Sequence, residues 1–119
     1  MTRQRLGSGE RIRHTSEFRT VFDRGRVSTS GPLRVHVRKT ERDQSRLGLA
    51  VSRRVGNAVR RNRIKRLLRV AFRSVRDGWV WPLDIVIVVL PHEPQSLEQY
   101  QLHLDRGVHT AAQLDEGGS

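Results

Sequence analysis

The segment that decides the fold runs from Arg53 to Arg76 and reads RRVGNAVRRNRIKRLLRVAFRSVR. It carries ten basic side chains and no acidic one, in a chain of 119 residues whose net charge is +11. Like charges at this density repel one another, so a compact fold tolerates them best when a polyanion neutralises them. Nucleic acid is therefore the expected partner, bound through its phosphates.

The same segment predicts an amphipathic helix from about Ala58 to Arg76, entered through a break at Gly56-Asn57. Its apolar positions follow the helical spacing i, i+3, i+4, and they are Ile64, Leu67, Leu68, Ala71, Phe72 and Val75. At 100° per residue, four polar positions fall on the opposite side: Asn62, Arg66, Arg69 and Arg73. We expect the helix to bury one face on a sheet and to present guanidinium groups on the other.

The segments before this helix predict a helix and two strands. Thr15 or Ser16 can cap a short helix that ends at Gly25, with Phe18, Val21 and Phe22 on one face. Leu33 to Lys39 alternates apolar and polar residues and predicts a half-exposed strand. Arg46 to Ser52 predicts a second strand, interpreted as the hairpin partner of the first.

The segments after the basic helix predict one more strand and one more helix. Asp84 to Leu90 is continuously apolar and β-branched, which favours a strand covered on both faces or central in its sheet. Ser96 can cap a final helix, whose inner stripe would be Leu97, Tyr100, Leu104, Val108 and Ala111. The predicted order is α-β-β-α-β-α, an α+β two-layer sandwich. We expect a flexible basic arm over 1–13, a single RNA-binding domain over 14–112 and a disordered tail over 113–119.

Composition narrows the function classes. The chain has no cysteine, which excludes disulfides, cysteine-bound zinc and thiol nucleophiles. The first residues lack the apolar core of a signal peptide, and the longest apolar run, Ile85 to Leu90, is too short to span a bilayer. A cytoplasmic location is the expectation. Arginine outnumbers lysine 21 to 2, which favours forked and stacking contacts with phosphates and bases.

Autonomous catalysis is not indicated by the sequence. The five histidines show no HxxxH or HxH pairing, and a metal-dependent nuclease also needs clustered carboxylates. Asp84 and Glu93 are interpreted as turn and capping residues. A DNA-binding factor fits less well because helix-turn-helix spacing and dimer heptads are missing. A membrane-surface helix would need the apolar face from Ile64 to Val75, which the core requires.

The stretch from Ser52 to Arg69, SRRVGNAVRRNRIKRLLR, resembles the signature of the bacterial ribonuclease P protein family. That signature is a strand ending in Ser and two basic residues, a Gly-Asn-Ala-Val turn, then Arg-Asn-Arg and Lys-Arg on a helix. The resemblance extends over about Arg13 to Leu104 through the Phe-xxx-Phe helix, the RLGLAVS strand and the Asp-Ile-Val strand.

The resemblance implies a function and partners. The family's protein binds a catalytic RNA and helps it to remove the 5′ leader from precursor tRNA, while the RNA, with Mg²⁺, hydrolyses the phosphodiester bond. Ribonuclease P RNA and precursor tRNA are thus the implied partners, Mg²⁺ is held mainly by RNA and substrate, and no membrane or obligate protein partner is expected. The resemblance also implies an unusual left-handed β-α-β crossover, against the general right-handed rule.

The resemblance assigns site residues as well. The predicted RNA-binding residues are Arg53, Arg54, Arg61, Asn62, Arg63, Lys65, Arg66, Arg69 and Arg73, of which Arg73 follows from the helix pattern alone. The leader cleft would be lined by Phe18, Phe22 and His36, and no residue of the chain is predicted to be catalytic. His36 stands where some members have a leader-contacting tyrosine, so leader preference stays open. Arg53-Arg54 replaces the family's common Lys-Lys pair and keeps the charge.

The aromatic residues have alternative interpretations. Phe18 and Phe22 are equally consistent with core packing and with base stacking, and one ring can serve each purpose. Phe72 lies on the apolar stripe and is interpreted as core, and Trp79 and Trp81 are interpreted as packing residues. A structural RNA-binding protein of ribosomal type remains the alternative function, because it would share the charge, the size and the arm.

Overall fold

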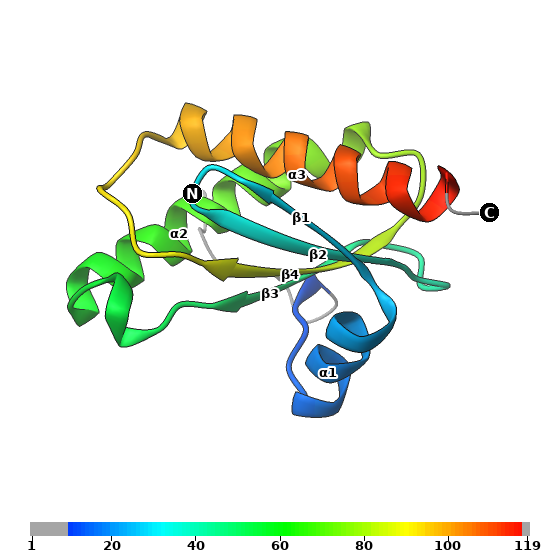
Figure 1. The fold of residues 1–119 in the computed structure, drawn as a ribbon, viewed down its shortest axis with the longest axis horizontal. Coiled ribbons are helices and arrows are strands. Elements are labelled where there is room, and N and C mark those ends of the chain that lie inside the picture. The colour runs from blue at the N-terminus through cyan, green and yellow to red at the C-terminus, as the bar shows by residue number, and fades with distance from the viewer. Residues whose placement is uncertain (1–9, 118–119) are drawn as a thin grey trace.

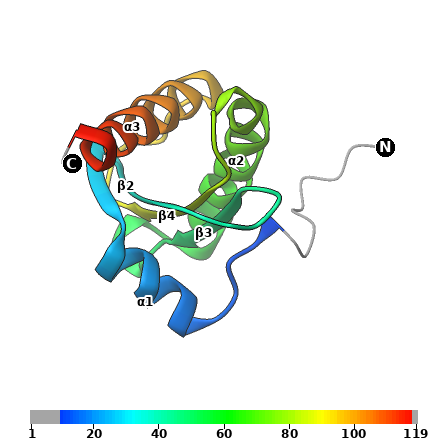
Figure 2. The same ribbon diagram turned by 90° about the vertical axis from the view of Figure 1, so that its right-hand side faces the viewer.

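The computed structural model describes residues 10–117, with side chains as far as Gln113, and forms one sheet with helices on both sides (Figure 1). The helices are α1 (Thr15–Arg24), α2 (Ala58–Val75) and α3 (Leu97–Gly117), and short 3₁₀ turns η2 (Arg53–Val55) and η3 (Arg76–Gly78) flank α2. The strands are β1 (Arg26–Ser30), β2 (Leu33–Lys39), β3 (Arg46–Ala50) and β4 (Leu83–Val89). Figure 2 shows α2 and α3 on one face of the sheet and α1 on the other.

The sheet has the order β1-β2-β4-β3. β4 is antiparallel to β2 and parallel to β3, with Ile85 opposite both Val37 and Leu47. The central position predicted for Asp84 to Leu90 is therefore confirmed, and α2 connects the two parallel strands. The predicted hairpin between Leu33–Lys39 and Arg46–Ser52 is wrong, because β4 lies between these strands.

The hairpin partner of β2 is β1, a strand that the predicted order α-β-β-α-β-α lacks. β1 reads RVSTS and lies at the sheet edge, where most of its residues keep contact with water. A polar edge strand has no apolar alternation that would reveal it. Gly31, with φ of 55°, makes the turn between β1 and β2 in a conformation that side chains rarely adopt.

The main core lies between the sheet and the pair α2 and α3. The stripe predicted for α2 is confirmed, with Ile64, Leu68, Ala71 and Phe72 buried and Leu67 and Val75 partly buried against the core. The stripe predicted for α3 packs beside it through Tyr100, Leu104, Val108 and Ala111. Burial of these side chains is the main stabilising contribution to the fold.

The helix ends follow from local hydrogen bonds. Asn57 caps α2 by accepting a hydrogen bond from the backbone of Arg60 at 2.9 Å. Ser96 and Gln99 form a reciprocal capping box before α3, as the serine indicates. The cap predicted at Thr15 or Ser16 is wrong, because His14 occupies that position.

The predicted boundaries of arm and tail need correction. Residues 10–13 do not belong to a flexible arm, because Ile12 is buried and its N–H donates to the carbonyl of Leu47 at 3.0 Å. Glu10 forms an ion pair with Arg76. The predicted tail is helical as far as Gly117. The rest of both predictions, 1–9 and 118–119, lies outside the described residues.

Within residues 10–117, none of the helices combines the length and the apolar character that a membrane crossing needs.

Candidate nucleic-acid interface

The first half of α2 presents its polar side chains to water. Asn62, Arg63 and Arg66 are exposed, while Arg61 and Lys65 are half-buried at the edges of this surface. The Nε of Arg61 donates to the carbonyl of Gly56 at 3.1 Å, which ties the helix to the turn before it. The predicted division of α2 into a core face and a cationic face is thus present in this half.

The second half of α2 departs from the helical pattern. Arg69 and Arg73 are half-buried rather than fully exposed. Arg73 lies 3.9 Å from Glu10, which also pairs with Arg76. The sequence could not show this, because residues 10–13 were interpreted as an arm without fixed contacts. The most exposed cations of α2 therefore lie toward its N-terminal half.

Arg53 and Arg54 extend this surface beyond the helix. Both are exposed in η2, directly before the turn that leads into α2. Val55, between them and the turn, is buried and fixes η2 against the core. The N-terminus of a helix favours anions, so this end of α2 combines two paired arginines with a favourable dipole.

The opposite face of the sheet carries an aromatic pair. Phe22 of α1 remains 39% exposed, and its ring meets His36 of β2 edge-on, with centroids 4.5 Å apart. Burial, and secondarily the charge of Arg34, lowers the pKa of His36. Burial therefore favours the uncharged imidazole, which contacts the exposed phenyl ring edge-on.

Phe18 is placed differently from Phe22. It packs against a small cluster of Ile12, Val21 and Val86. A Cβ on Gly48 would come within 2.7 Å of its ring, so the bare backbone of β3 is what admits Phe18. The two rings of the Phe-xxx-Phe helix thus have separate environments, one mainly in a small core and one open to water.

A hollow of about 150 Å³ connects the aromatic side with the basic helix. Phe18 and Gly48 line it from α1 and β3, and Lys65 and Arg69 line it from α2. One predicted leader-cleft residue, Phe18, therefore meets two predicted RNA-binding residues, Lys65 and Arg69, at this point. Arg69, which is half-buried, lines the hollow at this junction.

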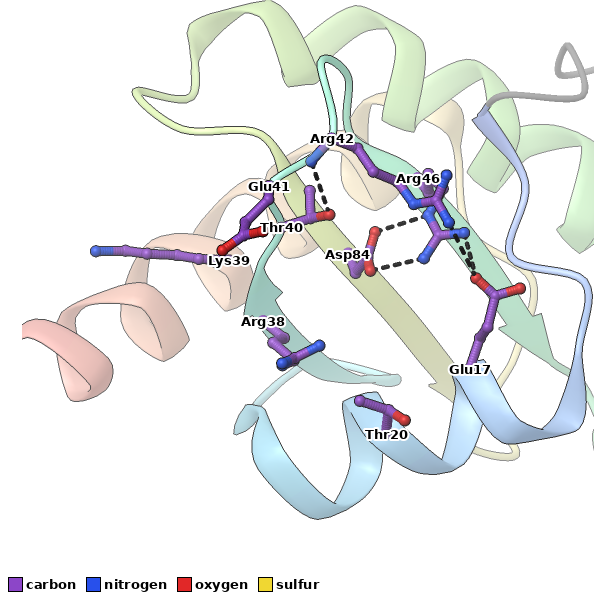
Figure 3. Close-up of a pocket in the computed structure, with 9 residues that line it drawn as sticks. All are labelled: Glu17, Thr20, Arg38, Lys39, Thr40, Glu41, Arg42, Arg46 and Asp84. Atoms are coloured by element: carbon purple, nitrogen blue, oxygen red, sulfur yellow. Dashed lines mark hydrogen bonds and ion pairs between the residues drawn. The ribbon is translucent and has the colours of Figure 1, made fainter.

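A charged network that the sequence interpretation missed fixes α1 on the sheet (Figure 3). Arg46 of β3 binds Asp84 of β4 through two hydrogen bonds of 2.9 and 2.8 Å and also donates to Glu17 of α1. Arg46 and Asp84 are buried. The hydrogen bond that Arg46 donates to Glu17 lowers the pKa of Glu17, and the hydrogen bonds that Arg46 donates to Asp84 raise the pKa of Arg46.

Asp84 is thus not the turn or capping residue that the sequence suggested. The available signal was an aspartate at the start of a buried apolar strand, because a buried carboxylate needs a cationic partner. Its partner lies 38 positions away, which no local pattern could reveal. The three residues also line a hollow of about 600 Å³ (Figure 3). Three basic residues, Arg38, Lys39 and Arg42, line the same hollow.

Of the remaining aromatic predictions, two are confirmed and one is wrong. Phe72 is fully buried, as predicted. Trp79 packs edge-on against Phe72 with centroids 5.8 Å apart. Trp81 is 54% exposed, so its interpretation as a packing residue is wrong.

In the described part of the chain, no three His, Cys, Asp or Glu side chains are grouped closely enough to hold a metal ion. The described residues therefore do not form a ligand set for a protein-bound Mg²⁺ ion.

Fold and surface together define a class of protein: a small α+β RNA-binding protein with a cationic helix on one side of its sheet and an aromatic surface on the other. The family model for ribonuclease P matches residues 6–112. The chain belongs to the ribonuclease P protein family. The general role of this family is RNA binding and tRNA 5′ processing, as part of an endoribonuclease complex.

Similar proteins agree with this assignment. The ribonuclease P protein component of Syntrophus aciditrophicus is 38% identical over 74% of this chain and 74% of its own length. That of Shouchella clausii is 44% identical, over 71% and 69%. The solved ribonuclease P protein of Staphylococcus aureus aligns with a TM-score of 0.72 at 29% identity, covering 86% of this chain and 94% of that one. The Thermotoga maritima protein gives 0.70 at 30%, covering 82% and 93%.

Proposed function

We propose that this chain is the protein subunit of a ribonuclease P, in which it binds the catalytic RNA and the 5′ leader of precursor tRNA. The RNA, with Mg²⁺ held mainly by RNA and substrate phosphates, hydrolyses the phosphodiester bond. The protein acts by binding and positioning, at a cytoplasmic location. The observation that carries the proposal is the junction at which Phe18 and Gly48 face Lys65 and Arg69 across one hollow.

The cationic surface is assigned to backbone phosphates. It consists of Arg53, Arg54, Arg61, Asn62, Arg63, Lys65, Arg66 and, at the junction, Arg69. Arg73 is the weakest member of the predicted set, because it lies close to Glu10. Phosphate contacts position an RNA without reading its sequence, which suits a partner recognised mainly by shape.

The aromatic surface is assigned to the single-stranded leader. Phe22 offers an exposed ring in edge-on contact with His36, and Phe18 lines the hollow that leads toward α2. By the strand register, the sheet beside them continues through Arg34, Val88 and Ala50 on the same face. Stacking on one aromatic ring contributes about 1–3 kcal/mol per base and tolerates any sequence.

The test mixes the purified chain with a precursor tRNA, with and without a bacterial ribonuclease P RNA, at low Mg²⁺. We expect no cleavage by the protein alone and a strong stimulation of the RNA. Cleavage without RNA would identify a nuclease in its own right. If no ribonuclease P RNA responds while the chain still binds RNA tightly, a structural protein of ribosomal type would be the better description.

A further inference from the structure

A second aromatic hollow lies outside the residues that the proposed function assigns to RNA, where the end of α2 approaches the start of β4. It measures about 310 Å³ and is lined by eight residues from three segments: Asp43, Gln44, Ser45, Arg76, Asp77, Trp79, Trp81 and Pro82. Both tryptophans of the chain line it. The proposed function makes no use of this hollow.

Hydrogen bonds donated by backbone N–H groups fix the segments around the hollow. The N–H of Leu83 donates to the hydroxyl of the buried Ser45 at 2.9 Å. The N–H of Thr40 donates to the carbonyl of Pro82 at 3.2 Å, and that of Trp79 to Arg76 at 3.1 Å. The hollow is therefore formed before any ligand arrives, which lowers the entropic cost of binding.

Trp81 provides a stacking surface. The residue is 54% exposed, and the Nζ of Lys39 lies over one face of its indole ring, 5.3 Å from the centroid. A large aromatic ring held in water beside a cation is a recurring way to bind nucleobases, because the ring stacks on the base while cations attract the phosphates.

The polar groups of the hollow match the edge of a base. The Nε1–H of Trp79 is buried and has no hydrogen-bond partner among the described residues. Two carboxylates, Asp43 and Asp77, line the same hollow with the amide of Gln44. Guanine is the base whose Watson–Crick edge offers two adjacent N–H donors, which one carboxylate can accept together.

We propose that this hollow binds one unpaired guanine base of an RNA, stacked on Trp81 and held at its Watson–Crick edge by Asp43 or Asp77. The inference rests on RNA binding as the general role of the family and not on the leader cleft. The chain's net charge of +11 favours a polyanion over an acidic or neutral surface of comparable size.

Intrinsic fluorescence tests this directly, because both tryptophans lie at the proposed site. The full chain is titrated with the single-stranded pentamers UUGUU, UUAUU and UUUUU at moderate salt. We expect saturable quenching, with UUGUU at least about fivefold tighter than the other two, since a bidentate contact to a base discriminates by about 1–3 kcal/mol.

Variants separate stacking from edge recognition. Trp81→Ala should weaken UUGUU at least about fivefold through lost stacking, with Trp79 as the remaining reporter. Asp43→Asn or Asp77→Asn should remove the preference for guanine and leave UUAUU binding unchanged. Leu102→Ala, at an exposed position of α3, should leave the quenching curves as they are. Circular dichroism confirms that each variant is folded.

Two results would overturn the proposal. Equal quenching by all three pentamers that disappears in high salt would reduce the effect to unspecific attraction. If the tryptophan fluorescence changed with protein concentration in the absence of RNA, the hollow would be a contact between two copies of the chain and not an RNA site. If the proposal holds, separate titrations with ribonuclease P RNA and with precursor tRNA show which RNA supplies the base. The leader-cleft proposal is tested separately, by the cleavage assay.

Discussion

The two faces of the sheet differ in what buries them. The face under α2 and α3 is closed by a continuous cluster of mainly apolar side chains, such as Leu68, Phe72 and Leu104. The face under α1 has only a small cluster around Val86, a buried ion network and an exposed phenyl ring. Stability is concentrated on one face, so the other can keep charged and aromatic groups that a core would exclude.

The largest effect should come from the closed face. Phe72→Ala removes a fully buried ring and is expected to lower the free energy of unfolding by about 3–5 kcal/mol. Leu102→Ala, an apolar truncation at an exposed position of α3, is the matched control and should stay within about 0.5 kcal/mol of the wild type. Urea unfolding measures both, and similar losses would contradict the contrast between buried and exposed positions.

On the other face, the largest loss of stability should follow from breaking the ion network of Arg46, Asp84 and Glu17. Asp84→Asn leaves Arg46 buried without its bidentate partner, which is expected to cost about 3 kcal/mol. Because Arg46 also holds Glu17, the variant should loosen α1 and weaken precursor tRNA binding in the holoenzyme. Thermal unfolding and hydrogen exchange of α1 measure this. A stable variant with protected α1 amides would show that the network does not position the helix.

The exposed ring should affect binding more than stability. Phe22→Ala is expected to weaken precursor tRNA relative to mature tRNA by about 1–3 kcal/mol while changing the melting temperature little. Phe18→Ala should also lower stability, because Phe18 packs in the small cluster. Leu102→Ala again serves as control. Equal losses for precursor and mature tRNA would place the leader elsewhere.

Acid should destabilise the aromatic pair. The folded-state pKa of His36 lies below its ordinary value of 6.5, so the unfolded chain binds a proton first as the pH falls. Stability should therefore decrease as the pH drops through about 6.5 and below. His36→Phe should remove this part of the pH dependence, as measured by urea midpoints between pH 5 and 7.5. An unchanged profile would mean that His36 is not responsible.

The smallest effect concerns a single phosphate contact. Arg66→Ala should reduce the slope of log K against log salt for ribonuclease P RNA by roughly 0.7–0.9. Arg106→Ala, at an exposed arginine of α3, should leave the slope unchanged. Reversed results would move the RNA interface to α3.

Local periodicity predicted what local contacts determine. The six apolar positions of α2 were predictable because their helical spacing reflects one buried face. The central strand Asp84–Leu90 was predictable because its continuous apolar run reflects burial on both faces. The partner of β2 could not, because alternation identifies a strand but not its neighbour. β1 was missed because RVSTS at a sheet edge buries almost nothing.

The candidate site was predictable to the same extent. Arg63 and Arg66 follow from the helix pattern and the family signature. The differing roles of Phe18 and Phe22 depend on Gly48 of a strand 30 positions later in the chain than Phe18. Arg73 is half-buried close to Glu10, and Trp81 lies beside the connection between β2 and β3. Neither neighbour is close in the sequence, so no local pattern could have predicted these contacts.

The most direct measurement of the central claim is chemical modification of arginine in the presence and absence of ribonuclease P RNA, read residue by residue by mass spectrometry. A cationic face of α2 laid on RNA predicts protection of Arg53, Arg54, Arg63 and Arg66, while Arg106 on α3 reacts as in the free protein. Protection of Arg106 with continued reactivity of Arg63 and Arg66 would contradict the account.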